Sequence, residues 1–198
     1  MRRSGAQDSD SSPLIAGILL AAGQSTRFGR QKLLEPWDGE PLVRKTAGCF
    51  LEGGLQPLVV VVSADPRLVD ALAGLPLTTV ENAHPERGIS SSIAIGVRAL
   101  PEATDAALIG VADQPFLTAG AIQALVKAFS PERIIVPRWG EHRGNPPVFD
   151  RRFFPELLTL SDDNGGQLVI AAHADAVTEV PFPAGLGDDI DRPEEWPR

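Results

Sequence analysis

The stretch from Leu14 to Lys32, LIAGILLAAGQSTRFGRQK, contains the features that decide the fold. Its first part, Leu14 to Leu20, is a continuous apolar run without the alternation that marks a strand with one face in water. Such a run predicts a strand buried on both faces, as in a parallel sheet. From Ala21 onward the residues become small and polar, which indicates that the strand ends there in a loop.

Short apolar runs and helical patterns alternate along the rest of the chain. We predict further strands at residues 58–62, 77–80, 106–111, 133–136 and 176–181. We predict helices at residues 41–51, 66–73, 90–100, 118–129, 153–160 and 167–174. This alternation is typical of an α/β protein with a mostly parallel sheet and helices on both of its faces. Ligands of such folds lie beyond the carboxyl ends of the strands, so we expect the chemistry in the loops that follow Leu20, Val80, Val111 and Val136.

The composition is that of an ordinary globular protein. The 198 residues include 18 Lys and Arg against 26 Asp and Glu, a net charge of -8, and 43% of them are hydrophobic. We expect a single domain over residues 13–198, preceded by a disordered tail at residues 1–12 that is rich in Ser, Asp and Gly. The acidic balance argues against a nucleic-acid partner, because duplex affinity depends on cations that neutralise phosphates.

The sequence also restricts the compartment and the metal chemistry. Cys49 is the only cysteine, so no intramolecular disulfide forms, and we expect a reducing, cytoplasmic location. Arg2 and Arg3 before the apolar run look like a secretory signal, but acidic residues follow them. No run approaches the roughly 20 apolar residues of a membrane span. The three histidines share no i, i+4 spacing, so we expect any metal to be a hard cation with oxygen ligands.

The loop after the first predicted strand combines small residues with two cations. Ala21, Ala22 and Gly23 leave the backbone N–H groups open, so these groups can form a concave nest for phosphate oxygens. Arg27 and Lys32 add full positive charges close to that nest. We interpret the loop as a polyphosphate clamp that is not a P-loop, because it lacks Gly-Lys-Ser/Thr. The alternative is a tight turn with two solvated cations.

An aspartate follows the predicted strand at residues 106–111, within Val111-Ala112-Asp113-Gln114-Pro115. A carboxylate at the exit of a buried strand lies at the edge of the cleft, where it can hold Mg²⁺ and, through it, a substrate phosphate. The alternative is an aspartate that only forms the turn before the proline.

Two further segments leave their roles open. Ser90, Ser91 and Ser92 follow Gly88 where a helix is predicted to begin, so they can cap the helix or donate hydrogen bonds to a nucleotide base or ribose. The segment at residues 187–196 places three carboxylates within four residues. These carboxylates form either a cation site or a solvated acidic tail.

These segments, in this order, resemble the nucleotidyltransferases of the molybdenum cofactor cytidylyltransferase type, within the wider MobA-like family. The resemblance covers about residues 14–196 and includes the signature L-A-A-G-x-S-x-R-x-G-x-x-K. It implies a Rossmann-like three-layer nucleotidyltransferase fold, catalytic roles for Arg27, Lys32 and Asp113, and Mg²⁺ held by Asp113 and Asp191. The residues assigned to nucleotide binding are Leu20, Ala21, Ala22, Gly23, Ser25, Arg27, Lys32, Gly88, Ser90, Ser91 and Asp113.

The second small residue of the first loop bears on the choice of base. Cytidylyltransferase members of the family tend to read L-A-A-G and guanylyltransferase members L-A-G-G, and this chain has the former at Leu20 to Gly23. The methyl group of Ala22 narrows the room for a purine, although a group of this size discriminates by only ~1–3 kcal/mol.

The half of the chain expected to face the acceptor departs from the family pattern. Residues 143–149 resemble the loop R-x-G-H/N-P-V-x-F with an extra proline, and Gln167 stands where an arginine is common. We assign Gln114, Arg143 and Asn145 to acceptor binding. Five arginines within residues 133–152 are either ordinary surface charge or a means of attracting an anionic acceptor such as a pterin phosphate.

The resemblance therefore implies transfer of CMP from CTP to the terminal phosphate of a molybdopterin-type cofactor, with release of pyrophosphate. Its partners would include a molybdoenzyme or its maturation chaperone. One alternative is the same chemistry with GTP or another nucleotide and a different phosphate or sugar-phosphate acceptor. Another is a non-catalytic nucleotide-binding chaperone for a molybdoenzyme. A nicotinamide oxidoreductase is disfavoured, because the dinucleotide fingerprint is absent.

Overall fold

The computed structural model describes residues 12–23, 25, 28–161 and 164–190, so residues 1–11 of the tail predicted at residues 1–12 lie outside the described part of the chain. The strands are β1 Ile15–Ala21, β2 Pro36–Trp37, β3 Glu40–Pro41, β4 Leu58–Val62, β5 Thr78–Glu81, β6 Ala106–Val111, β7 Ile134–Trp139, β8 His142–Arg143, β9 Val148–Asp150 and β10 Val177–Phe182. The α-helices are α1 Leu42–Glu52, α2 Pro66–Ala71, α3 Ile89–Arg98, α4 Ala119–Lys127, α5 Phe154–Leu157 and α6 Gln167–Ala172. Short 3-10 helices are η1 Lys32–Leu34, η2 Pro85–Arg87, η3 Arg151–Phe153 and η4 Ala174–Ala176.

The main sheet is mostly parallel, as predicted. Its strand order is β10-β7-β9-β6-β1-β4-β5, with β8 paired to the edge of β7. β1 pairs in parallel with both β4 and β6, and all seven of its residues are buried. The continuous apolar run thus forms a central strand with both faces covered, because only such a position removes every one of its side chains from water.

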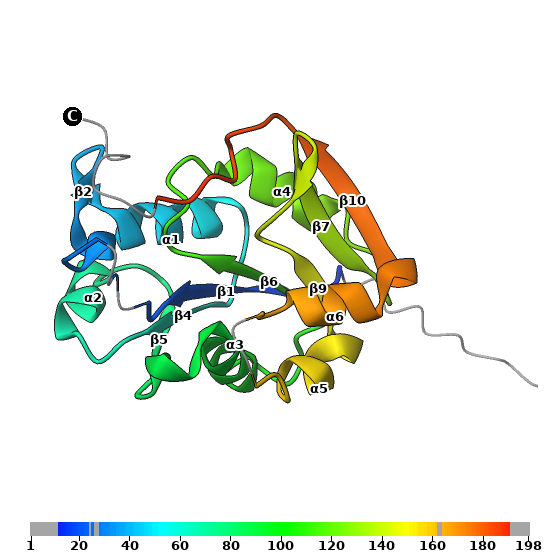
Figure 1. Cartoon of the computed structure of the whole chain (residues 1–198), viewed down its shortest axis with the longest axis horizontal. Coiled ribbons are helices and arrows are strands. Elements are labelled where there is room, and N and C mark those ends of the chain that lie inside the picture. Colours follow the sequence, from blue (N-terminus) through cyan, green and yellow to red (C-terminus); the bar gives the residue numbers. More distant parts are fainter. Residues whose placement is uncertain (1–11, 24, 26–27, 162–163, 191–198) are drawn as a thin grey trace, which may run out of the picture.

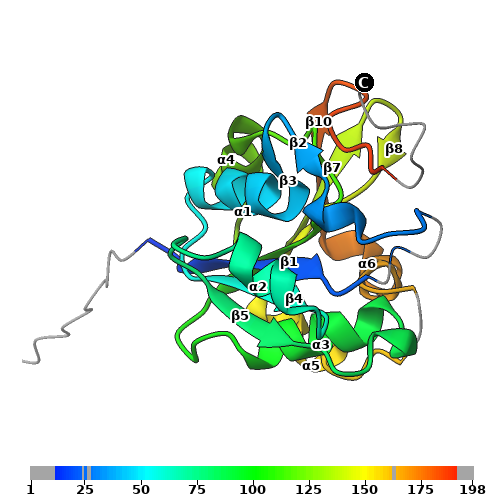
Figure 2. The ribbon, with the colours of Figure 1, turned by 90° about the vertical axis from the view of Figure 1, so that its left-hand side faces the viewer.

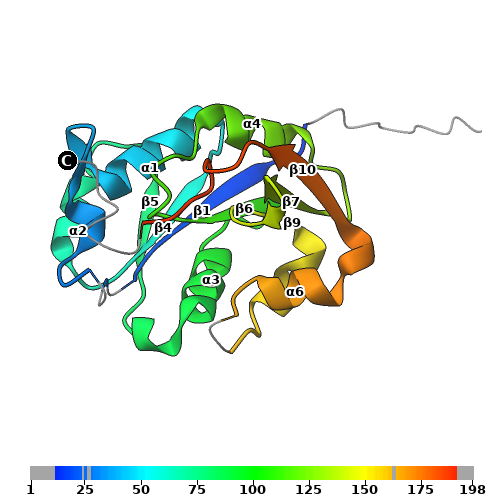
Figure 3. The ribbon, with the colours of Figure 1, turned by 45° about the horizontal axis from the view of Figure 1, so that its top comes forward.

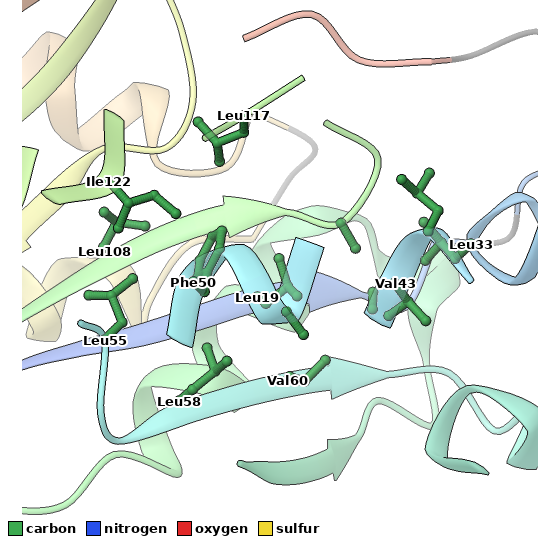
Figure 4. Packing of buried hydrophobic residues seen from close by; sticks show 14 of the residues in the cluster. Leu19, Leu33, Val43, Phe50, Leu55, Leu58, Val60, Leu108, Leu117 and Ile122 are labelled. Carbon is green, nitrogen blue, oxygen red and sulfur yellow. The ribbon is translucent and has the colours of Figure 1, made fainter. Parts of the chain in front are cut away.

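The helices form a layer on each face of the sheet. Figures 1 and 3 show α1 and α4 on one side and α3, α5 and α6 on the other. Side chains of β1 alternate between the two cores, so Leu19 packs in the cluster under α1 and Ile18 in the cluster under α3. In Figure 4, Phe50 of α1 lies over the sheet close to Leu19 and Leu108. The three-layer α/β prediction is confirmed.

Four of the described strands, β2, β3, β8 and β9, were not predicted from the sequence. β9 runs antiparallel to both β6 and β7. It has only three residues within a proline-rich segment, too few for a period to show. β2 and β3 form a small hairpin whose turn residues Asp38 and Gly39 have φ values of 52° and 92°. Asp-Gly is a strong signal for such a turn, and it was the signal available in the sequence.

Side chains cap the first turns of α2 and α4, whereas α3 begins without such a cap. The side chain of Asp65 accepts from the amide of Arg67 at the start of α2, and Thr118 accepts from the amide of Ala121 at the start of α4. The helix α3 begins instead after Gly88, whose φ of 83° turns the chain without a side-chain cap. The capping role expected for the serines at 90–92 is therefore wrong, because all three lie inside the helix.

Among the described residues, no helix combines the length and the hydropathy that crossing a bilayer would require.

The contact between α3 and β1 depends on Gly96. A Cβ at this position would lie 2.5 Å from Cγ2 of Ile18 and 3.3 Å from Cγ2 of Val61. We expect Gly96→Ala to lower the free energy of unfolding by about 1–3 kcal/mol, because the added methyl group would overlap side chains of a closely packed core. Urea denaturation followed by circular dichroism measures the effect.

Gly120 of α4 provides the matched control, because a Cβ there meets nothing within 4 Å. Gly120→Ala should leave the stability unchanged or raise it by roughly 0.5–1 kcal/mol through helix propensity. Equal effects of the two substitutions would contradict this account of the packing.

Candidate active site

The site forms where the parallel strands end at the same edge of the sheet. Leu20 of β1 is in register with Val111 of β6, and the amide of Ala112 donates to the Leu20 carbonyl at 3.0 Å. Glu81 of β5 is level with Val62 of β4. The loops after β1, β5 and β6 therefore start from adjacent points and converge. In Figure 2 the loop that follows β1 leaves the sheet at this edge.

A cavity of about 230 Å³ lies between these three loops. Seven residues that were assigned to nucleotide binding line it: Leu20, Ala22, Gly23, Ser25, Lys32, Gly88 and Asp113. Three other assigned residues, Ala21, Ser90 and Ser91, do not line it, and Arg27 lies outside the described residues. Ser92, one of the three serines with a possible nucleotide contact, also lines it, and the lining residues that sequence reasoning missed are Leu33, Pro85, Ile89, Val111 and Ala112.

The first loop folds back on itself around Ser25. This residue has a φ of 49°, and its carbonyl accepts from the amides of Phe28 and Gly29 at 3.0 and 3.2 Å. Its hydroxyl accepts from the amide of Lys32 at 3.3 Å and donates to the side chain of Gln31 at 3.1 Å. These bonds place η1, and with it Lys32, against the exit of β6.

Lys32 and Asp113 form an ion pair at the centre of the site. The lysine Nζ donates to Oδ2 of Asp113 at 2.7 Å and to the carbonyl of Ile190 at 2.7 Å. Lys32 is only 9% exposed, so it is not the solvated cation of the alternative interpretation. A charged pair so far out of water is retained only with compensating hydrogen bonds, which the Ile190 carbonyl supplies in part.

The other carboxylate oxygen of Asp113 fits a cation. Oδ1 is buried and has no hydrogen-bond partner within the described part of the chain. A buried acceptor without a donor is costly, and a divalent ion would satisfy it. The described ranges contain no cluster of three or more His, Cys, Asp or Glu side chains that could hold a metal. Asp191, the predicted second ligand, follows Ile190 directly but lies outside the described residues.

Asn82 fixes the wall of the cavity after β5, a role that sequence reasoning missed. Its side-chain amide donates to the hydroxyls of Ser91 and Ser92 at 2.9 Å each, and its carbonyl oxygen accepts from the amide of His84 at 2.9 Å. The hydroxyl of Ser91 also donates to the Gly88 carbonyl at 2.8 Å. Of these serines only Ser92 lines the cavity. The available signal was an asparagine at the exit of a strand.

A second cavity of about 210 Å³ adjoins the first and shares Leu20, Ile89 and Val111 with it. None of the described residues that line it is charged. Its polar side chains are the carboxamides of Asn145, Asn164 and Gln167. Its apolar wall includes Ile93, Ile109, Phe149 and Ile170. Carboxamides offer both donors and acceptors, so the cavity suits an uncharged ring with a polar edge.

The three residues assigned to acceptor binding lie in different surroundings. Asn145 lines the second cavity, but Gln114 is 4% exposed and its Nε2 donates to the Gly187 carbonyl at 2.5 Å. Gln114 lines a different cavity, against α1. Arg143 lines none of these cavities and donates from Nε to Glu179 at 2.6 Å. Both side chains are engaged within the chain and away from the second cavity.

The arginines of residues 133–152 are likewise engaged within the chain. The Glu179 carboxylate lies 3.4 Å from Nε of Arg138 and 2.6 Å from Nε of Arg143, so this one negative charge is shared by two arginines. Arg133 donates to the Thr178 hydroxyl and to two backbone carbonyls. Arg151 donates to the Glu102 carbonyl. The guanidinium of Arg152 lies 3.8 Å from the carboxylate of Glu132. The excess positive charge counted along the sequence is therefore largely neutralised in the fold.

Cys49 behaves as a packing residue. Burial, with a smaller effect of Glu52, raises the pKa of its thiol to about 11, and Sγ donates to the Leu117 carbonyl at 3.2 Å. The thiol therefore stays protonated near neutral pH, so Cys49 acts as a small buried side chain rather than as a nucleophile. Outside the site, the hydrogen bond from the Arg67 side chain lowers the pKa of Asp65.

Comparison with known proteins defines the class. Residues 17–177 match the family model of the MobA-like NTP transferase domain. The chain is 30% identical to nicotine blue oxidoreductase of Paenarthrobacter nicotinovorans over 94% of its own length and 96% of that protein. It is 32% identical to the purine catabolism protein PucB of Bacillus subtilis, covering 93% and 95% of the two chains. The chain belongs to the family of MobA-like NTP transferases.

Two further relationships agree with this family. A molybdenum cofactor guanylyltransferase of Xanthomonas euvesicatoria is 30% identical over 56% of this chain and 52% of that one. A nucleotidyl transferase from Methanothermobacter has the same fold, with a TM-score of 0.81, 22% identity and coverage of 93% and 94% of the two chains. Transferases of this type typically use a divalent metal ion. The protein is therefore a nucleotidyltransferase by family, with an NTP as its substrate.

Gly23 offers a direct test of where the nucleotide binds. A Cβ at this exposed position meets no atom within 4 Å, so Gly23→Ala should fold normally. If phosphate oxygens approach the backbone here, the methyl group obstructs them, and we expect the affinity for CTP or GTP with Mg²⁺ to fall about tenfold or more. Isothermal titration calorimetry measures it.

Gly48→Ala in α1 is the control, because a Cβ at Gly48 also meets nothing within 4 Å and this residue does not line the first cavity. An unchanged affinity of Gly23→Ala would show that the triphosphate binds elsewhere.

Proposed function

We propose that this protein transfers CMP from CTP to the terminal phosphate of a molybdopterin-type cofactor and releases pyrophosphate, in a Mg²⁺-dependent reaction. The observation that carries the proposal is the meeting of Gly23, Lys32 and Asp113 around one cavity at the carboxyl edge of the sheet. An open backbone turn, a fixed cation and a carboxylate with an unsatisfied oxygen are the groups that a metal-bound triphosphate needs.

The proposed reaction needs no covalent enzyme intermediate. An oxygen of the acceptor phosphate attacks the α-phosphorus of CTP in line, and the bond between the α-phosphorus and the bridging oxygen breaks. Pyrophosphate leaves with the electron pair of that bond. Mg²⁺ held by Asp113 and Asp191 would supply neutralisation of phosphate charge. Lys32 and Arg27 would stabilise the negative charge that builds on the departing pyrophosphate.

The ion pair of Lys32 implies an exchange of partners on substrate binding. Its Nζ is bonded to Asp113 and Ile190 at 2.7 Å each. To reach the triphosphate, the ammonium would replace the carboxylate with a phosphate oxygen. Asp113 would then be free to turn both oxygens toward a cation.

The second cavity supports a heterocyclic acceptor. Its carboxamides and apolar walls, the described lining residues, would hold the ring of a pterin rather than its phosphate. The terminal phosphate would point into the adjoining first cavity, toward Lys32. Relatives carry names connected with the molybdenum cofactor and with purine and nicotine metabolism. Asn145 is the acceptor-binding residue that we retain from the sequence.

Three other activities compete with this proposal. GTP or another nucleotide could replace CTP, with a different phosphate or sugar-phosphate acceptor. A chaperone for a molybdoenzyme would bind the nucleotide without turnover. One relative is named an oxidoreductase, which favours testing nicotinamide cofactors although the chain lacks their fingerprint. We place the proposed activity in the cytoplasm, where a molybdoenzyme or its maturation chaperone would receive the product.

The activity test measures pyrophosphate release with molybdopterin as acceptor and each of the four NTPs in turn. We expect CTP to give the highest kcat/KM. Lys32→Ala should lower kcat by about 10²–10³-fold, the usual cost of losing one preorganised group that stabilises developing charge. Lys127→Ala, an exposed lysine at the end of α4, is the control.

The outcomes separate the competing activities. Binding of CTP without pyrophosphate release would support the chaperone, and oxidation of NADPH would support the oxidoreductase. Activity of Lys32→Ala within a few-fold of the wild type would remove this lysine from the mechanism.

Ala22 tests the choice of base. It is 3% exposed and lines the first cavity. Ala22→Gly should lower the ratio of kcat/KM for CTP to that for GTP by about tenfold, because a group of methylene size is worth ~1–3 kcal/mol in discrimination. Ala21→Gly is the control, since Ala21 is buried without lining that cavity. A ratio that Ala22→Gly leaves unchanged would mean that another residue selects the base.

A further inference from the structure

The segment after the last strand returns to the site. Residues 183–190, here called the C-terminal strap, leave the edge strand β10 and cross back toward α1 and the end of β1 (Figures 1 and 3). Three hydrogen bonds join the strap to the residues around Asp113. The Ile190 amide donates to the Asp113 carbonyl at 3.0 Å, Lys32 Nζ donates to the Ile190 carbonyl at 2.7 Å, and Gln114 Nε2 donates to the Gly187 carbonyl at 2.5 Å.

The strap is closely packed where Gln114 holds it. A Cβ at Gly187 would lie 2.1 Å from Nε1 of Trp139, so the backbone there rests directly on the indole ring. The indole N–H in turn donates to the Asn145 carbonyl at 2.9 Å. Three residues further on, Ile190 is 1% exposed and belongs to the core under α1. The strap is therefore seated between Trp139 at one end and the exit of β6 at the other.

We propose that Gln114 is a positioning residue that fixes the strap in register, so that the strap presents the Ile190 carbonyl to Lys32 and the Ile190 amide to the Asp113 carbonyl. Gln114, which follows Asp113 directly in the chain, thereby also fixes the position of the strap relative to Asp113. Gln114 contacts neither the nucleotide nor the acceptor in this role. The proposal deepens the proposed function, because it concerns the same cation site, but its main test does not require transferase activity.

The geometry separates this role from simple packing. Gln114 is 4% exposed, and its donor is directed at one strap carbonyl rather than at a neighbour in its own loop. If the bond is lost, the strap can shift along Trp139, and the Ile190 carbonyl moves with it. Lys32 then loses the Ile190 carbonyl as an acceptor, and the position of Asp113 relative to the strap is no longer fixed.

The test measures binding of Mn²⁺ alone by electron paramagnetic resonance, in the full chain and without nucleotide. We expect Gln114→Met, which keeps the length of the side chain and removes the donor, to bind Mn²⁺ at least tenfold more weakly. Gln114→His restores a ring N–H and should recover a substantial part of the affinity. Gln123→Met is the matched control, because Gln123 Nε2 donates to the Glu52 carbonyl at 3.0 Å outside the site.

Several results would overturn the proposal. One is wild-type Mn²⁺ affinity in Gln114→Met, even if its urea midpoint falls, because a merely structural role would change stability alone. Another is an equal loss in Gln123→Met. If Gln114→Met does not fold, hydrogen exchange in the wild type decides: the Ile190 amide should be protected, and further protected by Mn²⁺. An Ile190 amide that exchanges as fast as an open chain would refute a fixed strap.

The test also distinguishes this inference from the proposed activity. A protein that transfers no CMP but shows weaker Mn²⁺ binding in Gln114→Met would retain the positioning role and lose the proposed reaction. Transferase activity together with wild-type Mn²⁺ affinity in that variant would do the reverse.

Discussion

The ion pair between Lys32 and Asp113 is the interaction on which the rest of the site depends. It joins residues 81 positions apart in the sequence, and it can form only because β1 and β6 lie side by side and end in register. The apolar run of β1 favours that position, since a strand buried on both faces belongs in the interior of a sheet that helices cover on both sides, and here β4 and β6 are its parallel neighbours. The same residues that make the core thus decide where the charged groups meet.

The site consists of two adjoining cavities whose linings differ in chemistry. The first has a cation, a carboxylate and an open glycine turn, and the second has carboxamides and apolar walls. Charge is therefore concentrated where phosphate chemistry would occur, and the neighbouring volume can change its shape and polarity without disturbing it. This separation gives a physical reason why members of one NTP transferase family can carry names that refer to different acceptors and pathways.

Local signals predicted the fold and the first cavity well, and long-range pairings poorly. The buried run of β1, the caps at Asp65 and Thr118, and the loop around Gly23 all depend on neighbouring residues, which a sequence displays directly. The partners of Gln114 and Arg143 lie 73 and 36 residues away, and they could not be predicted because no periodicity encodes such contacts. The number of arginines in residues 133–152 also could not reveal Glu179 of the edge strand β10, whose carboxylate pairs with Arg138 and Arg143.

The most direct measurement of the central claim is a crystal structure of the protein with CTP and Mg²⁺. The account predicts the triphosphate between the Gly23 turn and Lys32, with the ion at about 2.0–2.1 Å from an oxygen of Asp113. It also predicts that Lys32 has moved from the carboxylate to a phosphate oxygen. A nucleotide bound elsewhere, or a metal ion that Asp113 does not contact, would contradict the account.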